Sequence, residues 1–440
     1  MNRNVKGEFD LRSLYNRKAL VFVSLLFMVV LVSSCFILVF RGVSPFVSGA
    51  SDIVVNNEAE LKDAINNAAG PTIIALNKDI TLTESLAIPA NKDITLTSTS
   101  TTKLFKLIGT DRYREYDVVT YGYPDTIIVK GDGVLRLNGI VVTHVNYTCG
   151  DGVNVDIGGT LIMHHGEITG NIDPNYSIHA GFTSDGCGGG VRNSGTFEMY
   201  GGTISNRRHY GVHNSAYGTF SMSGGEIINN AGFGVYNICT YTGVEWHIGL
   251  FSMSGGVIRN NTGGVQNSGN FSMSGGEISA NIAIFSGNWV SGNGGGVSNS
   301  GVFSMFGGKI SDNQAVNGGG VYNYPDGNFS LSGNGVISNN RAEVGGGVYN
   351  AGTFNRRDGI ISGNTAEKSG DDVYTVNSGD GSSGGGNGSG ESSNWDGFSL
   401  RDILIICVGV IGVVGVILFF IFKREKKPDR GKNEPQTRLH

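Results

Sequence analysis

The acidic side chains are the first candidates for chemistry in this 440-residue chain. Glycoside hydrolysis needs two placed carboxylates, and a calcium site needs a cluster of oxygen ligands. Six aspartates of the repeats described below do not recur at one position; they are Asp151, Asp156, Asp173, Asp185, Asp312 and Asp358. Glu226 and Glu277 do share a position, but valine and lysine replace them in other copies. We interpret these carboxylates as solvated turn residues and predict no catalytic residue.

The histidines do not predict a metal site either. Seven of the eight lie between residues 144 and 247. His164 and His165 are adjacent and would point to opposite faces of a strand, so they cannot share one ion. His209 and His213 have the spacing of ligands on a helix, but they would straddle a corner between strands. We therefore expect neither a metal nor another cofactor.

A row of outward side chains is the better candidate for binding. The residue after the repeated valine would point away from the core, and down the copies it is Arg192, His213, Tyr236, Gln266, Ser298, Tyr322, Tyr349 and Tyr374. Exposed aromatic rings and polar tips suit contacts with sugars or protein surfaces. We expect ligand contacts from the arginine, the histidine and the four tyrosines. The alternative is that an outward tyrosine simply suits a strand.

Cysteine positions predict one disulfide. Cys149 and Cys187 each lie four residues before the repeated valine, so they occupy the same position of adjacent copies. Neighbouring strands bring such positions within disulfide range, and a bridge would imply an oxidising compartment. The alternative is two buried thiols that align by chance. Cys239 lies at a different position and should be free.

Six Asn-X-Ser/Thr sequons are candidate glycosylation sites. They begin at Asn146, Asn175, Asn260, Asn270, Asn328 and Asn387. Asparagine is abundant in this chain, so several sequons are expected by chance. Their use depends on a host with glycosylation machinery.

One repeated sequence between residues 150 and 375 would position most of these side chains. Its parts are Gly-Gly-Val-x-Asn, Phe-Ser-Met and Gly-Gly-x-Ile-x-x-Asn, as in Gly294–Asn313. Phenylalanine and methionine alternate with serine, which is the period of a strand, and glycine pairs allow sharp corners. A unit of roughly 21–25 residues with three short strands predicts one coil of a parallel β-helix. Stacked coils would bury their valine, phenylalanine, methionine and isoleucine columns.

Two asparagine columns accompany the apolar columns. The asparagine two residues after the valine would point inward and form a ladder of hydrogen-bonded amides. The asparagine three residues after the isoleucine could form a second ladder or could simply be a turn residue. The sequence leaves these two interpretations open.

The chain before the repeats predicts export and a cap. Residues 1–18 are basic, and residues 19–40 carry no charge, which suits a transmembrane helix and also a cleaved signal sequence. Within residues 51–150 we expect a short helix capped by Asn57, followed by irregular first coils. This cap would cover the strand edges that end a solenoid.

The chain after the repeats predicts a membrane anchor. The array at 151–376 is followed by a Gly/Ser linker at 377–394. Residues 403–422 are uncharged and the basic tail at 423–440 follows, so a helix would span the membrane with the C-terminus in the cytoplasm. Three insertions interrupt the array and should project from its corners: Ile172–Asp185, Cys239–Ile248 and Ala283–Asn293.

Composition and repeat length exclude several classes of protein. The net charge is -5 and no basic strip follows the repeats, which argues against nucleic-acid binding. The chain has 71 glycines but only 8 prolines, which excludes collagen and a simple disordered linker. Regular leucine columns are absent, which excludes a leucine-rich repeat. A WD-type propeller is excluded because its blade needs roughly 40 residues.

The repeat motifs resemble a known family. Gly-Gly-Gly-Val-Tyr-Asn occurs at 318–323 and 345–350, and Phe-Ser-Met-Ser-Gly-Gly-Glu-Ile occurs at 220–227 and 271–278. These motifs are similar to those of the adhesin-like, right-handed parallel β-helix proteins of prokaryotic surfaces, over roughly residues 52–375. The resemblance implies a pectate-lyase-like superfold. It does not imply an activity, because the same superfold also hosts pectate lyases and polygalacturonases.

Together these features predict an all-β protein, namely a right-handed parallel β-helix solenoid with a helix-containing cap and terminal transmembrane helices. We expect a membrane-anchored protein whose repeats lie outside the cell and bind a glycan or a surface protein without catalysis. One alternative is a cell-surface polysaccharide lyase or glycoside hydrolase on the same fold. Another is a structural component of the envelope.

Overall fold

The structure is a computed structural model that describes residues 52–110, 124–145, 150–170, 188–207, 209–283 and 292–376. All of these belong to one compact unit. The expected membrane helices at 19–40 and 403–422, the linker and both basic ends lie outside the described residues. Within the described part of the chain, no helix is long and apolar enough to cross a membrane.

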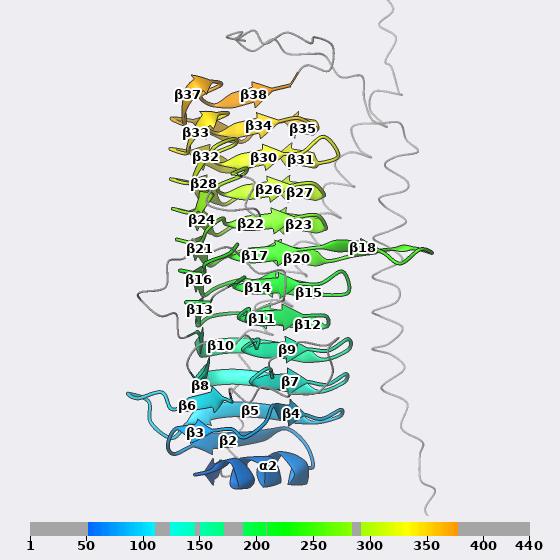
Figure 1. Cartoon of the computed structure of the whole chain (residues 1–440), viewed down its shortest axis with the longest axis vertical. Coiled ribbons are helices and arrows are strands. Elements are labelled where there is room, and N and C mark those ends of the chain that lie inside the picture. The colour runs from blue at the N-terminus through cyan, green and yellow to red at the C-terminus, as the bar shows by residue number, and fades with distance from the viewer. Residues whose placement is uncertain are drawn as a thin grey trace, which may run out of the picture. The chain divides into compact units, whose positions relative to one another are not determined.

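Short parallel strands stack coil upon coil (Figure 1). A regular coil contributes one strand to an eleven-stranded sheet, which we call the valine sheet, and two strands to the arms of a 21-stranded sheet. We name these the phenylalanine arm and the isoleucine arm. The register is the expected one, since Phe271 lies opposite Phe303 and Val321 lies opposite Val348. The parallel, β-helix-like solenoid predicted from the repeats is confirmed.

The strand bounds follow the repeats closely. The valine sheet contains β4 (Leu86–Ile88), β7 (Ile127–Val129), β9 (Val153–Val155), β11 (Val191–Asn193), β14 (Val212–Asn214), β17 (Val235–Asn237), β22 (Val265–Asn267), β26 (Val297–Asn299), β30 (Val321–Asn323), β34 (Val348–Asn350) and β38 (Val373–Thr375). The phenylalanine arm contains β1 (Ile53–Val55), β2 (Thr72–Leu76), β5 (Asp93–Ser98), β8 (Val134–His144), β10 (Thr160–Thr169), β12 (Thr196–Met199), β15 (Thr219–Met222), β20 (Leu250–Met253), β23 (Asn270–Met273), β27 (Val302–Met305), β31 (Asn328–Leu331) and β35 (Thr353–Arg356). The isoleucine arm contains the second halves of β8 and β10 together with β3 (Ile80–Thr81), β6 (Lys106–Gly109), β13 (Thr203–Ser205), β16 (Glu226–Ile228), β21 (Val257–Arg259), β24 (Glu277–Ser279), β28 (Lys309–Ser311), β32 (Val336–Ser338) and β36 (Ile360–Ser362).

Some coils contain strands in addition to the regular three, in two places. The last four coils carry a fourth short strand, and these strands form a four-stranded sheet of β25 (Ile282–Ala283), β29 (Gln314–Ala315), β33 (Arg341–Val344) and β37 (Thr365–Ser369). The repeat pattern did not predict this sheet, because its strands lie in the variable stretch between the isoleucine and valine columns. The insertion at Cys239–Ile248 is an antiparallel hairpin of β18 (Cys239–Tyr241) and β19 (Trp246–Ile248).

In the core, most side chains stack on the same type of side chain in the next coil. From Phe197 to Phe354, successive phenylalanine rings lie 4.5 to 4.9 Å apart between centroids and within 5° to 9° of parallel. Near-parallel rings at these centroid distances are compatible with the offset stacking that aromatic pairs prefer, and the in-register strands place them there. The six rings from Phe197 to Phe329 are at most 2% exposed. Their burial against the next coil is the main apolar stabilisation of the stack.

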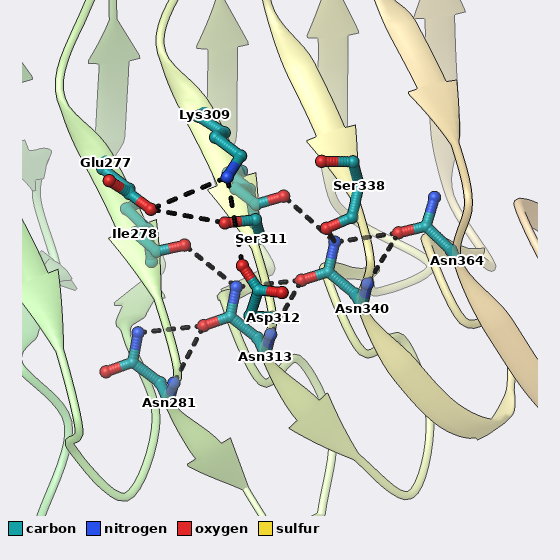
Figure 2. A network of polar contacts seen from close by, with 11 residues as sticks. Glu277, Ile278, Asn281, Lys309, Ser311, Asp312, Asn313, Ser338, Asn340 and Asn364 are labelled. Atoms are coloured by element: carbon teal, nitrogen blue, oxygen red, sulfur yellow. Dashed lines mark hydrogen bonds and ion pairs between the residues drawn. The ribbon is translucent and has the colours of Figure 1, made fainter.

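Both asparagine columns are ladders, which answers the question that the sequence left open. In the first, Asn237 donates from Nδ2 to Asn267 Oδ1 at 2.8 Å, and Asn267 repeats the contact to Asn299. In the second, Asn313 donates from both its backbone N and Nδ2 to Asn340 Oδ1 at 3.0 Å (Figure 2). The second column therefore satisfies the backbone at a buried corner in addition to making a turn.

The residue before each asparagine of the second ladder adopts a left-handed backbone. It is Asn229, Asn260, Ala280, Asp312, Asn339 or Gly363, with φ between 53° and 70°, and Asn206 before Arg207 has a φ of 54°. Asparagine and aspartate tolerate this conformation better than other side chains with a Cβ. Ala280 has no such compensation and is a strained exception. The corner geometry therefore explains why a polar residue so often precedes the ladder asparagine.

The N-terminal cap is the expected short helix, α2 (Glu58–Asn67), shown in blue in Figure 1. Asn57 caps it by accepting a hydrogen bond from Glu60 N at 2.9 Å. Leu61 and Ile65 are fully buried against the first strands, as the predicted apolar face requires. At the other end Arg356 enters the methionine column, and its guanidinium donates to Gly359 O. A charged group in an apolar column opposes further stacking at this end.

Candidate functional site

The outward residues of the valine sheet form one continuous column, which we call the outer ladder. The pairings run from Arg192 to His213, Tyr236, Gln266, Ser298, Tyr322, Tyr349 and Tyr374, each opposite the next. The structure therefore brings all six predicted contact residues onto one face. Gln266 and the buried Ser298 divide them into two groups.

The tyrosine group lies near the C-terminal end of the stack. The rings of Tyr322 and Tyr349 are 4.7 Å apart and nearly parallel, and Tyr374 follows at 5.0 Å. Tyr324 packs its edge against Tyr322. Burial raises the pKa of Tyr322 and Tyr349, and the neighbouring tyrosines add to that effect, so both hydroxyls stay protonated at neutral pH. Because stacking covers ring faces, this group offers mainly ring edges and hydroxyls to a ligand.

The histidine group lies closer to the N-terminus. His213 stacks on Tyr236 at 5.4 Å, and Tyr210 packs against both rings. Burial, with a smaller contribution from the Arg192 guanidinium, lowers the pKa of His213 to about 4. Burial also lowers the pKa of His209 to about 4. Both imidazoles are therefore neutral at pH 7, and each can donate one hydrogen bond and accept another.

A carboxylate pair supports the N-terminal end of the outer ladder. Asp151 accepts from Arg192 Nε at 2.7 Å with one oxygen and from Gly189 N at 2.7 Å with the other. Asp125 accepts from Asp151 N and from Asn154 Nδ2, both at 2.9 Å. Burial raises the pKa of Asp125 to about 6, and the charge of Asp151 contributes. Each carboxylate thus joins its own coil to the next.

This pair corrects the interpretation of Asp151 as a solvated turn residue. Asp151 is only 5% exposed. It lies two residues before Val153, and Asp125 lies two residues before Ile127, which pairs with Val153. The two aspartates therefore share a column. Extending the alignment of the repeats one coil upstream, to the Ile127 strand, would have found it.

A buried arginine interrupts the second asparagine ladder. Arg207 occupies the ladder position and donates from its backbone N to Asn230 Oδ1 at 3.1 Å. Its Nη1 lies 3.3 Å from His144 Nδ1, across the intervening coil. Its Nε and Nη2 are buried without a hydrogen-bond partner in the described residues. Burial lowers the pKa of Arg207 to about 10, which still leaves it charged at neutral pH.

The remaining predicted sites are only partly within the described residues. Cys149 and Cys187 lie outside them, so the disulfide stays a prediction, as do the sequons at Asn146, Asn175 and Asn387. Asn260, Asn270 and Asn328 are exposed. Cys239 is a free, half-buried thiol. In the described part of the chain, no group of three or more His, Cys, Asp or Glu residues is placed to hold a metal ion.

At neutral pH this face combines neutral imidazoles, protonated phenols and an Arg192–Asp151 ion pair. Such groups can hydrogen-bond and pack, and within the fold Asp151 and Arg192 are already paired with each other. Comparisons with protein-family models, with curated proteins and with solved structures found no match. A function is therefore inferred from the residues of this chain alone.

Proposed function

We propose that this protein is a membrane-anchored surface protein whose β-helix lies outside the cell and binds glycans or surface proteins without catalysis. The uncharged segment 403–422 and the basic tail after it support the anchor and its orientation. Crossover connections between parallel strands are right-handed in about 98% of cases, which supports a right-handed solenoid. The motif resemblance supports an adhesin-like role on a pectate-lyase-like superfold.

The observation that carries this proposal is the tyrosine group of the outer ladder. Tyr322, Tyr349 and Tyr374 repeat the same hydroxyl and ring edge from coil to coil at the strand spacing of about 4.8 Å. A regular row of donors and apolar edges suits a ligand that has its own repeat, such as a polysaccharide. Aromatic side chains of this kind dominate the binding energy at many interfaces.

The test uses the full-length protein in liposomes, applied to an array of defined glycans and assayed for retention and for cleavage. Tyr349→Ala should weaken retention about tenfold, because loss of a central aromatic contact costs roughly 1–2 kcal/mol. Tyr200→Ala is the matched control, since Tyr200 is exposed at another corner of the stack. Equal retention of the wild type and the Tyr349 variant would show that the tyrosine group does not contact the ligand.

One observation favours an enzyme as the second candidate. Asp125 has a pKa of about 6 beside a second carboxylate, and an acid that titrates near neutrality suits proton transfer. A lyase or hydrolase would release products from a bound polysaccharide, and Asp125→Asn would abolish that release while retention persists. A structural envelope component would show neither retention nor release.

A further inference from the structure

The hairpin β18–β19 is an addition to an otherwise regular corner. In the following coil this corner is the four residues Asn267 to Asn270. In the hairpin coil, Gly249 N donates to Ile238 O at 2.8 Å, so the chain closes the corner and inserts residues 239–248 between these two. The hairpin projects beyond the other loops on that edge of the stack (Figure 1).

The two faces of the hairpin differ in chemistry. Paired residues of an antiparallel ladder share a face. Thr240 and His247 form one face, and the His247 ring packs at 4.4 Å on Tyr217 of the preceding coil. The opposite face consists of the pairs Cys239–Ile248 and Tyr241–Trp246. This second face is apolar and largely open to solvent, with Trp246 64% exposed.

The hairpin tip and the neighbouring coils extend this apolar surface. Val244 at the tip is 88% exposed. The same corner carries further exposed apolar side chains, which are Leu250 of the hairpin coil and Ile157, Tyr217 and Val302 of other coils. Glu245 is the only Asp, Glu, Lys or Arg between residues 239 and 248, and it lies 3.5 Å from His247. We call the hairpin and these four residues the hairpin edge.

We propose that the hairpin edge docks into the headgroup region of the bilayer that anchors the chain, with Trp246 and Val244 inserted. Tryptophan and tyrosine favour the membrane–water interface, because an apolar ring and a polar group meet there. The hairpin has no lysine or arginine, so its chemistry suits zwitterionic phospholipid and does not require anionic lipid. This inference rests on the membrane anchor of the proposed function.

The length of chain outside the structure is compatible with this docking. From β17, which precedes the hairpin, to the last strand β38 there are five strand steps in the valine sheet, or about 24 Å. Residues 377–402 separate the array from the predicted membrane helix and span roughly 25–31 Å as a flexible chain. The two lengths match, so the solenoid can lie with its hairpin edge on the bilayer.

The test reconstitutes the full-length chain into vesicles of dioleoylphosphatidylcholine and of its brominated analogue. Trp246 is one of three tryptophans, so Trp289→Phe with Trp395→Phe leaves it as the only one. Docking predicts a blue-shifted Trp246 emission that the brominated lipid quenches. Emission typical of water without quenching, from chains that sediment with the vesicles, would overturn the docking and leave the anchor intact.

Matched variants distinguish insertion from a change of fold. Val244→Asp should abolish the quenching, whereas Phe306→Asp should preserve it, because Phe306 is exposed at a different corner. Equal quenching in the two variants would refute insertion of the tip. A blue shift that depends on protein concentration without lipid would assign the hairpin edge to a second copy of the chain. If the chains fail to enter vesicles at all, both the membrane anchor and the docking are refuted.

Discussion

Removing one amide from the second asparagine ladder should destabilise three coils at once. Asn281 is fully buried. Its Oδ1 accepts from Asn261 N and Asn261 Nδ2, and its Nδ2 donates to Ile258 O and to Asn313 Oδ1, all at 3.0 to 3.1 Å. Asn281→Ala deletes all four bonds and leaves the buried backbone N–H of Asn261 without an acceptor.

The magnitude follows from these contacts. Four hydrogen bonds at a net 0.5–1.5 kcal/mol each give a loss of about 2–6 kcal/mol, and the orphaned N–H places the result in the upper half of that range. In a solenoid each coil contacts only its neighbours, so the loss should open the stack locally around β21 and β24. Asn281→Asp should be similarly destabilising at neutral pH, because its second oxygen would face the Ile258 and Asn313 oxygens.

Hydrogen–deuterium exchange of the full-length protein, read by mass spectrometry, measures this effect coil by coil. Peptides that span residues 258–283 should exchange faster by a factor that matches the lost free energy. Asn270→Ala is the control, because Asn270 is exposed and belongs to neither ladder. If the Asn281 variant protects these peptides as well as the control does, the ladder contributes nothing and the reasoning fails.

Three further predictions concern strain, the hairpin and acid. Ala280→Gly should raise the thermal midpoint of unfolding, since glycine relieves left-handed strain of about 1 kcal/mol; a lower midpoint would contradict the strain. Deleting residues 239–248 should leave the midpoint nearly unchanged, because Ile238 and Gly249 already close the corner; a large drop would show that the hairpin supports the stack. Burial lowers the folded-state pKa of His144 to about 3 and of His213 to about 4, below the ordinary 6.5. Above pH 6.5 both imidazoles are neutral in the folded and the unfolded chain, and the free energy of unfolding keeps its full value. As the pH falls toward 3, the unfolded chain takes up these protons first, and the free energy of unfolding decreases by about 3 kcal/mol or more per histidine. Replacing both histidines with glutamine should weaken the pH dependence of the free energy of unfolding, measured by chemical denaturation at several pH values between 7 and 4. An unchanged pH dependence would refute the assignment. Asp125 changes the free energy of unfolding in the opposite direction as the pH falls. Its folded-state pKa is raised to about 6, so its protonation stabilises the folded chain and partly offsets the loss from the histidines.

The periodicity of the sequence alone determines the columns of this protein. Parallel strands in register place like residues over like, so the spacing of Phe271 and Phe303 already implies that they stack. The same periodicity predicts the outer ladder from Arg192 to Tyr374 and the corner from which the 239–248 insertion projects. Helix α2 was also predictable, because Asn57 and Glu60 make a local cap that needs no tertiary partner.

Only the tertiary structure decides what each outward or corner residue contacts. Asp151 is buried and Asp125 is half-buried, each accepts hydrogen bonds from the next coil, and the sequence shows neither the burial nor these bonds. The faces of the Tyr322 and Tyr349 rings are stacked, whereas Trp246 on the hairpin is open to solvent, and the repeat pattern predicts neither ring arrangement. The reason is physical: backbone periodicity fixes which side chains are neighbours, but burial, ring orientation and pKa depend on the packing of the coils on either side.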